Sequence, residues 1–208
     1  MPSLLKLKRR FQGQELLNES HKGSDLRSMA AFQARLLGSQ FSECKFGLAD
    51  LRNTVINGCL FSECSMQMVN FSVATVRGCR FVKCDLEQAF FTGAILEDCS
   101  FDECRMAYST FAGATLRENV RFHGCNLHGA DLDFIEAAHP NFLGSNLWGV
   151  KQPLGCAFWN GKFDSDHVKY FAAMLARMSD DRFTKSRLID IAGDKFMVVE
   201  RLMGGQDE

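Results

Sequence analysis

The feature that most constrains the fold is a 20-residue repeat that contains a shorter repeat of five. The four blocks between residues 41 and 120 each open with phenylalanine, at Phe41, Phe61, Phe81 and Phe101. After Arg121 the register slips by one residue, and the pattern resumes at Phe122 and Phe142. Self-similarity at a fixed period of this length is typical of solenoid proteins, in which each repeat packs against its neighbours.

Inside each block, two positions in every five have a fixed character. Every fifth residue from 41 to 116 is large and apolar, as in Phe41, Phe46, Leu51 and Ile56. The residue two places before each of these is small, as in Ser39, Cys44, Ala49 and Thr54. No Asp, Glu, Lys or Arg between 41 and 150 falls at either position. Because burying an unpaired charge is costly, both positions are predicted to point inward.

This pattern fits neither the 3.6-residue period of a helix nor the two-residue period of a flat strand. A period of five with two inward residues indicates a short straight segment followed by a corner. Four such segments close one coil of 20 residues. Stacked coils should lie about 4.8 Å apart and be joined by backbone hydrogen bonds of the parallel-sheet kind. The sequence therefore predicts an all-β solenoid.

Two segments, Ala49-Asp50-Leu51 and Ala130-Asp131-Leu132, have the form of a known five-residue motif. With the periodicity above, the chain resembles the pentapeptide-repeat family. The resemblance implies a right-handed quadrilateral β-helix and extends over residues 39–150. Such a fold hosts many functions, so the function has to be sought in the surface.

The flanks of the repeat suggest further divisions of the chain. Residues 1–10 are predicted to form a flexible basic arm. Residues 11–38 are predicted to form irregular coils that cap the core, with a loop at NESHKG and a one-residue slip in RSMAAFQ. The extra residue within 117–121 is interpreted as a bulge that leaves the stack intact, and a binding protrusion is the alternative.

Residues 151–208 are predicted to form a partly helical extension. A helix near Asp166 would present an apolar stripe, formed by Val168, Phe171, Leu175 and Met178. The following segment fits either a hairpin at Gly193-Asp194 or a helix broken there. The extension can cap the open end of the solenoid or pair two protomers. Similarity to the ending of quinolone-resistance pentapeptide proteins implies the second possibility, a homodimer.

No residue pattern indicates catalysis, so we expect a protein that is not an enzyme and has no catalytic, cofactor or metal site. The cysteines recur every 20 residues at the small inward position and are interpreted as buried hydrophobic residues. Reduced thiols in such columns favour the cytoplasm. His123 and His128 are interpreted as surface residues. The start of the chain lacks the pattern of a signal peptide, and no apolar run is long enough to span a membrane.

Two outward surfaces are candidates for partner binding. One is an acidic stripe interspersed with Lys45, Lys83 and Arg105, and its members are Glu43, Glu63, Asp85, Asp102 and Glu103. The other is apolar and stacks Leu48, Met68, Gln88 and Tyr108 beside Phe90. It adjoins an uncharged face formed by Ser72, Val73, Thr75, Thr92, Gly93, Ile95, Ala112, Gly113 and Thr115. An exposed apolar strip marks a contact surface, covered by the C-terminal segment or by a partner.

These surfaces support two hypotheses, both for a non-catalytic macromolecule-binding protein. Similarity to quinolone-resistance and topoisomerase-toxin immunity proteins implies a DNA mimic that binds and protects DNA gyrase or topoisomerase IV. The alternative is a protein–protein scaffold or a secreted bacterial effector without nucleic-acid mimicry. The chain has 24 basic and 25 acidic residues, so no direct contact with nucleic acid or membrane is expected.

Overall fold

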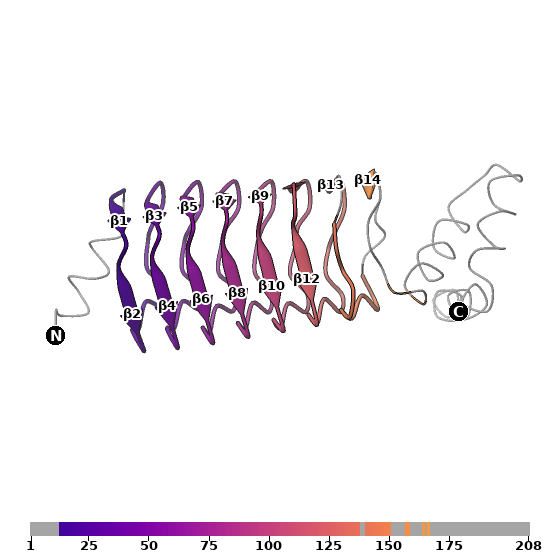
Figure 1. The fold of residues 1–208 in the computed structure, drawn as a ribbon, viewed down its shortest axis with the longest axis horizontal. Helices are drawn as coiled ribbons and strands as arrows, with labels where there is room; N and C mark the ends of the chain where they lie inside the picture. Colours follow the sequence, from indigo (N-terminus) through magenta and orange to yellow (C-terminus); the bar gives the residue numbers. More distant parts are fainter. Residues whose placement is uncertain (1–12, 138–139, 151–156, 159–163, 165, 167–208) are drawn as a thin grey trace, which may run out of the picture. The chain divides into compact units, whose positions relative to one another are not determined.

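The computed structural model describes residues 13–137, 140–150, 157–158, 164 and 166. The chain divides into two compact units, Met1–Lys162 and Phe163–Glu208. The described part of the first unit is a stack of similar coils that follow one another along an axis (Figure 1). No helix in the described part of the chain has the length and apolarity needed to cross a bilayer.

Short parallel strands form two sheets along this stack. The eight-stranded sheet contains, in order, β1 (Glu15–Leu17), β3 (Arg35–Leu37), β5 (Val55–Asn57), β7 (Thr75–Arg77), β9 (Ile95–Glu97), β11 (Thr115–Arg117), β13 (Glu136–Ala137) and β14 (Ala157–Phe158). The six-stranded sheet contains β2 (Ser20–Lys22), β4 (Gln40–Ser42), β6 (Leu60–Ser62), β8 (Arg80–Val82), β10 (Ser100–Asp102) and β12 (Arg121–His123). Most neighbouring strands pair residues that are 20 apart, such as Phe61 with Phe81.

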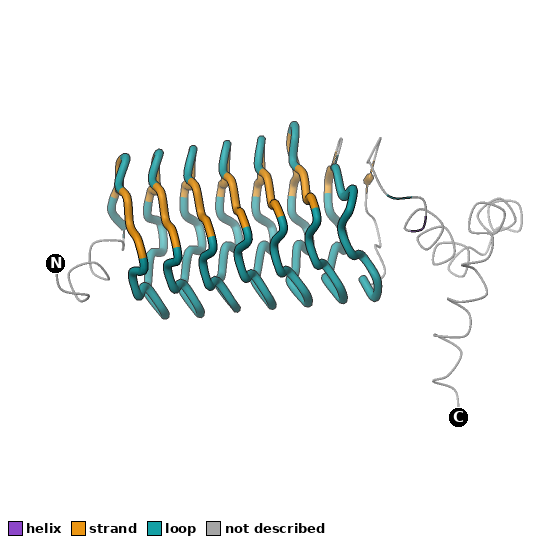
Figure 2. Tube along the Cα trace, turned by 60° about the horizontal axis from the view of Figure 1, so that its bottom comes forward, coloured by secondary structure: helices purple, strands orange, loops and turns teal. Residues whose placement is uncertain are grey.

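Each coil has four sides, which we number along the chain. In the coil that begins at residue 39, face 1 is 39–43 and includes β4, and face 4 is 54–58 and includes β5. Face 2 (44–48) and face 3 (49–53) are built from turns, joined to the next coil by isolated bridges such as Lys45 with Ser65. Figure 2 shows the two strand-bearing sides next to each other and the loops along the remaining sides. The predicted four-sided parallel β-helix is thus confirmed.

The core is a set of side-chain columns along the axis. Phe41, Phe61 and Phe81 are fully buried and stack ring on ring, with centroids 5.1 and 4.9 Å apart. A second column of Phe71, Phe91 and its neighbours meets the first edge-on. Both geometries are favourable arrangements for aromatic pairs. All of the large inward residues predicted between 41 and 116 are buried, so the assignment of inside and outside is correct.

The cysteines form two further columns in the wall. The eight described cysteines are reduced and buried. Each thiol lies against backbone carbonyl groups, as Cys84 Sγ does, which donates to Phe61 O of the preceding coil at 3.4 Å and to Val82 O at 3.6 Å. Neighbouring thiols of Cys104 and Cys64, together with burial, raise the pKa of Cys84 above its ordinary value. These residues therefore act as small buried hydrophobic groups with a weak donor.

The extra residue in the chain is absorbed at one corner. Between β11 and β12 the register changes from 20 to 21, so that Phe101 pairs with Phe122. Val120 enters the core, whereas Asn119 remains outside and donates to Asp98 Oδ1 at 2.9 Å. The stack continues on both sides of this corner, which confirms the bulge interpretation.

The N-terminal coils differ from their expected irregularity. β1 and β2 pair with β3 and β4 in the same 20-residue register, so NESHKG is part of a regular coil. His21 takes the place of a core phenylalanine, stacks on Phe41 at 5.3 Å and lies 3.1 Å from Glu19 Oε2. In RSMAAFQ the large and small inward residues are exchanged, as Met29 and Ala31, without any slip in register. The sequence pattern failed here because polar or exchanged residues fill ordinary coil positions.

The C-terminal boundary also lies further along than expected. β14 pairs with β13, joining Glu136 to Ala157 and Ala137 to Phe158. The eight-stranded sheet therefore continues beyond residue 150, within a segment interpreted from the sequence as a linker. The basic arm predicted over 1–10 and the apolar stripe of Val168, Phe171, Leu175 and Met178 lie outside the described residues.

Candidate protein-interaction surface

A strip of exposed apolar side chains follows the corner between faces 2 and 3. We call it the corner strip, and its members are Leu48, Met68, Phe90 and Tyr108. Leu48 and Tyr108 are 59% and 60% exposed, and Met68 and Phe90 are partly exposed. Leu48, Met68 and Tyr108 occupy the same position in different coils, 20 residues apart or a multiple of it. The structure thus confirms that these predicted residues are aligned and outward-facing.

Three of these residues have a backbone conformation that disfavours large side chains. Leu48, Met68 and Tyr108 have φ values of 61°, 55° and 58°. Each coil corner requires such a left-handed residue, and glycine fills many of these positions, as at Gly93 and Gly113. A side chain in this region costs roughly 1–2 kcal/mol relative to glycine. The backbone at this corner therefore favours glycine over a large apolar residue.

The uncharged area beside the strip covers the next corner, between faces 3 and 4. Val73 is 64% exposed, and Val55 at the start of β5 is also exposed. Thr75, Ile95 and Thr115 follow Val55 in the same column of the eight-stranded sheet. A Cβ atom built on Gly93 or Gly113 meets nothing within 4 Å. The polar side chains of this area are the hydroxyls of Ser72, Thr75, Thr92 and Thr115.

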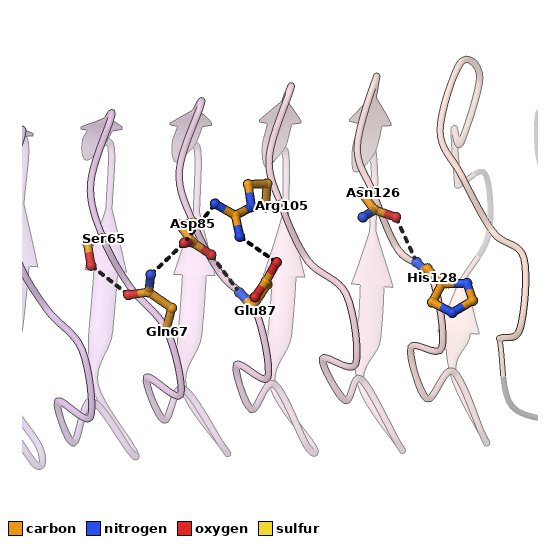
Figure 3. A network of polar contacts seen from close by, with 7 residues as sticks. All are labelled: Ser65, Gln67, Asp85, Glu87, Arg105, Asn126 and His128. Atoms are coloured by element: carbon orange, nitrogen blue, oxygen red, sulfur yellow. Dashed lines mark hydrogen bonds and ion pairs between the residues drawn. The ribbon is translucent and has the colours of Figure 1, made fainter.

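A network of polar side chains covers face 2 next to the corner strip (Figure 3). Ser65 Oγ donates to Gln67 Oε1 at 2.6 Å, and Gln67 Nε2 donates to Asp85 Oδ2. Arg105 binds two acids, with Nη2 2.7 Å from Glu87 Oε1 and Nη1 3.4 Å from Asp85 Oδ2. These contacts raise the pKa of Arg105 above its ordinary value, chiefly through the hydrogen bond to Glu87. The network holds long side chains in fixed positions.

Further along face 2 the polar row continues without charge. Asn126 Oδ1 accepts from the backbone N–H of His128 at 3.2 Å and from Asn146 Nδ2 at 3.0 Å. The His128 ring meets the Tyr108 ring edge-on, with centroids 5.6 Å apart. Through this ring contact, Tyr108 of the corner strip packs against His128 of the polar row.

A depression interrupts face 2 at Gly47. Its volume is about 540 Å³, and it is lined by Asp25, Arg27, Ser28, Gly47, Leu48, Gln67 and Met68. Arg27 and Gln67 occupy the equivalent position in the coils before and after, so the hollow lies where glycine supplies no side chain. The sequence reasoning missed this feature, although the column Arg27, Gly47, Gln67 can be read from the 20-residue spacing.

The acidic residues predicted as one stripe lie on more than one face. Glu43, Glu63 and Glu103 end face 1 in successive or alternate coils, and Lys83 stands in the same column. Asp102 belongs to β10, and Asp85 belongs to the face 2 network. Ion pairs neutralise several members: Glu43 lies 3.0 Å from Lys22 Nζ, and Glu103 lies 3.8 Å from Lys83 Nζ. The stripe is therefore a mixed surface.

The sequence placed His123 and His128 close together on the surface. The described residues contain no group of three or more histidine, cysteine or acidic side chains that could hold a metal ion. Cys125, which lies between them in sequence, points inward and donates to Phe101 O at 3.2 Å. His123 and His128 are both exposed, as the sequence predicted.

Several solved structures are similar to this chain at low sequence identity. HetL, described as a pentapeptide repeat protein involved in heterocyst differentiation regulation in the cyanobacterium Nostoc, is 20% identical over 74% of this chain and 87% of its own, with a TM-score of 0.49. QnrB1, a plasmid-mediated fluoroquinolone resistance protein, is 17% identical over 80% of this chain and 89% of its own, with a TM-score of 0.38. A pentapeptide repeat protein of the Arabidopsis thaliana thylakoid lumen is 20% identical over 61% of this chain and 70% of its own, with a TM-score of 0.29.

The comparison with curated proteins found no significant match. The family assignment comes instead from the repeat itself. A family model described as a pentapeptide repeat region matches residues 34–111 and 74–151, which together cover more than half of the chain. This span agrees with the coils described above, including their five-residue sides and inward columns. The chain therefore belongs to the pentapeptide repeat proteins.

Proposed function

We propose that this protein acts without catalysis, by binding another protein through the corner strip. The observation that carries the proposal is the alignment of Leu48, Met68 and Tyr108 along one corner, with Phe90 beside them. Contiguous exposed apolar side chains rimmed by polar groups are typical of protein interfaces. The rim is present here as the face 2 network of Gln67, Asp85 and Arg105.

The physical argument is that these side chains carry two costs that the isolated fold does not offset. They expose apolar area to water, and they occupy left-handed corner positions, which elsewhere in the stack mostly carry glycine or a polar residue such as Asn53 or Glu63. Residues kept in unfavourable conformations at exposed positions often have a binding role. Burial of these side chains against a partner would be favourable by about 25 cal/mol for each Å² of apolar surface removed from water.

A random dodecapeptide display library tests this proposal. The full chain and the variant Leu48→Gly/Met68→Gly/Tyr108→Gly are used as targets in parallel. We expect the unaltered chain to enrich peptides that the variant binds at least tenfold more weakly. Glycine suits these φ values, so the variant should fold.

Phe134→Gly is the matched control. Phe134 has the same kind of corner position, with φ 55° and 61% exposure, but lies outside the corner strip. This variant should retain the binding of the enriched peptides. Equal binding by all three chains, or enrichment of no peptide, would refute the role of the strip.

A second candidate function is binding to a type II topoisomerase as a mimic of DNA. The observation that favours it is the exposed acidic column of Glu43, Glu63 and Glu103, within a segment, 41–150, that carries 13 acids and 8 bases. A DNA mimic needs a strongly one-signed surface. The ion pairs of Glu43 with Lys22 and Glu103 with Lys83 weaken that field. We therefore rank this candidate below general protein binding.

A supercoiling assay with purified DNA gyrase or topoisomerase IV, with and without a quinolone, tests the second candidate. If it is correct, the protein changes supercoiling or quinolone inhibition, and replacing Glu43, Glu63 and Glu103 by lysine removes that effect. The glycine variant of the corner strip serves as the comparison, because it leaves these acids in place. An unchanged assay with both enzymes would eliminate topoisomerase binding.

A further inference from the structure

We propose that the depression at Gly47 and the adjacent Lys45 bind an extended segment of a protein partner in which an acidic residue stands two positions from a large apolar residue. The inference rests on the proposed function and names the chemistry of the partner. It is carried by the shape of face 2 and by the distribution of ion pairs on it.

The depression accommodates an apolar side chain. Leu48 and Met68 of the corner strip line one part of it, Arg27 and Gln67 flank the space left by Gly47, and Asp25 and Ser28 complete the lining. Its volume of about 540 Å³ falls within the range of ligand pockets, roughly 300–1,000 Å³. An inserted leucine or phenylalanine would thus bury its own surface together with part of the corner strip.

Lys45 is a base two residues before Gly47, and its bridge partner in the preceding coil is Asp25, an acid that pairs with Arg27. On face 2, Arg27 binds Asp25 through Nε and Nη2 at 3.0 and 2.7 Å, and Arg105 binds Asp85 and Glu87. Lys45 is exposed, and among the described residues no acid lies within ion-pair distance of it. An acidic group on the partner would complement this charge.

The spacing between these two features fixes the spacing within the partner. Lys45 and Gly47 are the two outward positions of one side of a coil, two residues apart. In extended chains, residues two apart lie on the same side, separated by about 6.6 Å. A partner strand that lies along the coil can therefore place a carboxylate near Lys45 and an apolar side chain over Gly47 at the same time.

The structure offers a variant that fills the depression without strain. Gly47 lacks the positive φ of the corner glycines, and a Cβ atom built on it is 3.7 Å from its nearest neighbour, Gln67 O. Gly47→Gln should therefore fold, since the next coil already carries glutamine at the same position. Lys45→Glu tests the charge. Arg80→Glu is its matched control, because Arg80 is an exposed base on face 1 with no ion pair among the described residues.

The experiment uses immobilised dodecapeptides of serine and glycine that carry one of four motifs: Glu-x-Leu, Lys-x-Leu, Glu-x-x-Leu or Glu-x-Ser. The full chain should bind Glu-x-Leu at least tenfold more tightly than the other three. Gly47→Gln should lose that binding, Lys45→Glu should prefer Lys-x-Leu, and Arg80→Glu should behave as the unaltered chain does. Added salt should weaken the preference for glutamate, because the pair is exposed.

Failure of this inference can be distinguished from failure of the proposed function. If the display library yields peptides that need the corner strip but the array shows no advantage for Glu-x-Leu, the binding surface stands and the acidic–apolar motif is refuted. Equal effects of Lys45→Glu and Arg80→Glu would also refute it. If neither the library nor the array gives binding, both proposals are refuted.

Discussion

The ring of Tyr108 lies over Gly129 of the next coil. A Cβ atom built on Gly129 would be 2.6 Å from Tyr108 Cε1, closer than any real contact of this kind. The ring occupies the space where the equivalent corner residue of the next coil would project, and Tyr108 is still 60% exposed. One glycine thus permits the orientation of the last residue of the corner strip.

Replacing Gly129 by alanine should change the position of the Tyr108 ring. Alanine at φ 65° costs about 1 kcal/mol in backbone conformation, and its methyl group must also displace the ring. Gly93→Ala provides the control, since Gly93 has φ 63° and nothing within 4 Å. Gly93→Ala should lose about 1 kcal/mol in denaturant unfolding, and Gly129→Ala should lose at least as much. In NMR spectra, only Gly129→Ala should shift the ring resonances of Tyr108. Unshifted Tyr108 resonances in both variants would contradict the contact.

Replacing Phe81 by aspartate should unfold the solenoid. The side chain is fully buried between Phe61 and Phe101, and an unpaired carboxylate there would cost several kcal/mol. Phe90→Asp is the matched change at an outward position, where the side chain is 38% exposed. Circular dichroism and thermal melting should show a folded Phe90 variant and an unfolded Phe81 variant. A cooperative, unshifted melt for Phe81→Asp would invalidate the inward assignment.

The buried thiol of Cys84 should lower the stability of the fold at alkaline pH. Neighbouring thiols and burial raise the pKa of Cys84 in the folded state, so the fold favours its protonated form. Its contribution to the free energy of unfolding is complete below the ordinary thiol pKa of 9.0 and is lost as the pH rises above it. Denaturant unfolding between pH 7 and 10 should show this loss, and Cys84→Ala should reduce its slope. A flat profile in the unaltered chain would contradict the prediction.

Deleting Asn119 should leave the fold intact. Deletion restores the 20-residue register between β10 and β12 and keeps Val120 at the inward position, while the bond from Asn119 to Asp98 is lost. That exposed hydrogen bond contributes about 1 kcal/mol, so unfolding should change by no more than that. Deleting Val120 instead removes a buried side chain and should be clearly more destabilising. Similar losses for the two deletions would show that the corner is not a simple bulge.

The sequence predicted the core accurately because two constraints act on every coil. Large apolar residues must fill the axis, and charged residues must remain in water. These two constraints together produce the fixed five-residue pattern between 41 and 116. The same rule failed at His21 and Glu19. His21 and Glu19 hydrogen-bond to each other at the end of the phenylalanine column, so they can occupy inward positions. A search for apolar residues at those positions does not detect such a pair.

The candidate surface was predicted only in part. The alignment of Leu48, Met68 and Tyr108 follows from the 20-residue spacing, which places residues from different coils in one column. Ion pairing does not follow from spacing. Arg105 contacts Asp85 and Glu87 of the preceding coil because of the conformation of its long side chain, which the sequence does not specify. The same limitation made a mixed surface look like an acidic stripe.

By itself, the sequence determined the period, the inward columns and the outward position of the corner strip, since these depend on the burial of residue types at fixed intervals. The tertiary structure decided which charges neutralise one another, where Gly47 leaves space between Arg27 and Gln67, and that Lys45 lacks a partner among the described residues. The physical reason is distance. A column brings together residues that are 20 apart, but contact within it depends on side-chain length and direction, which the repeat leaves unspecified.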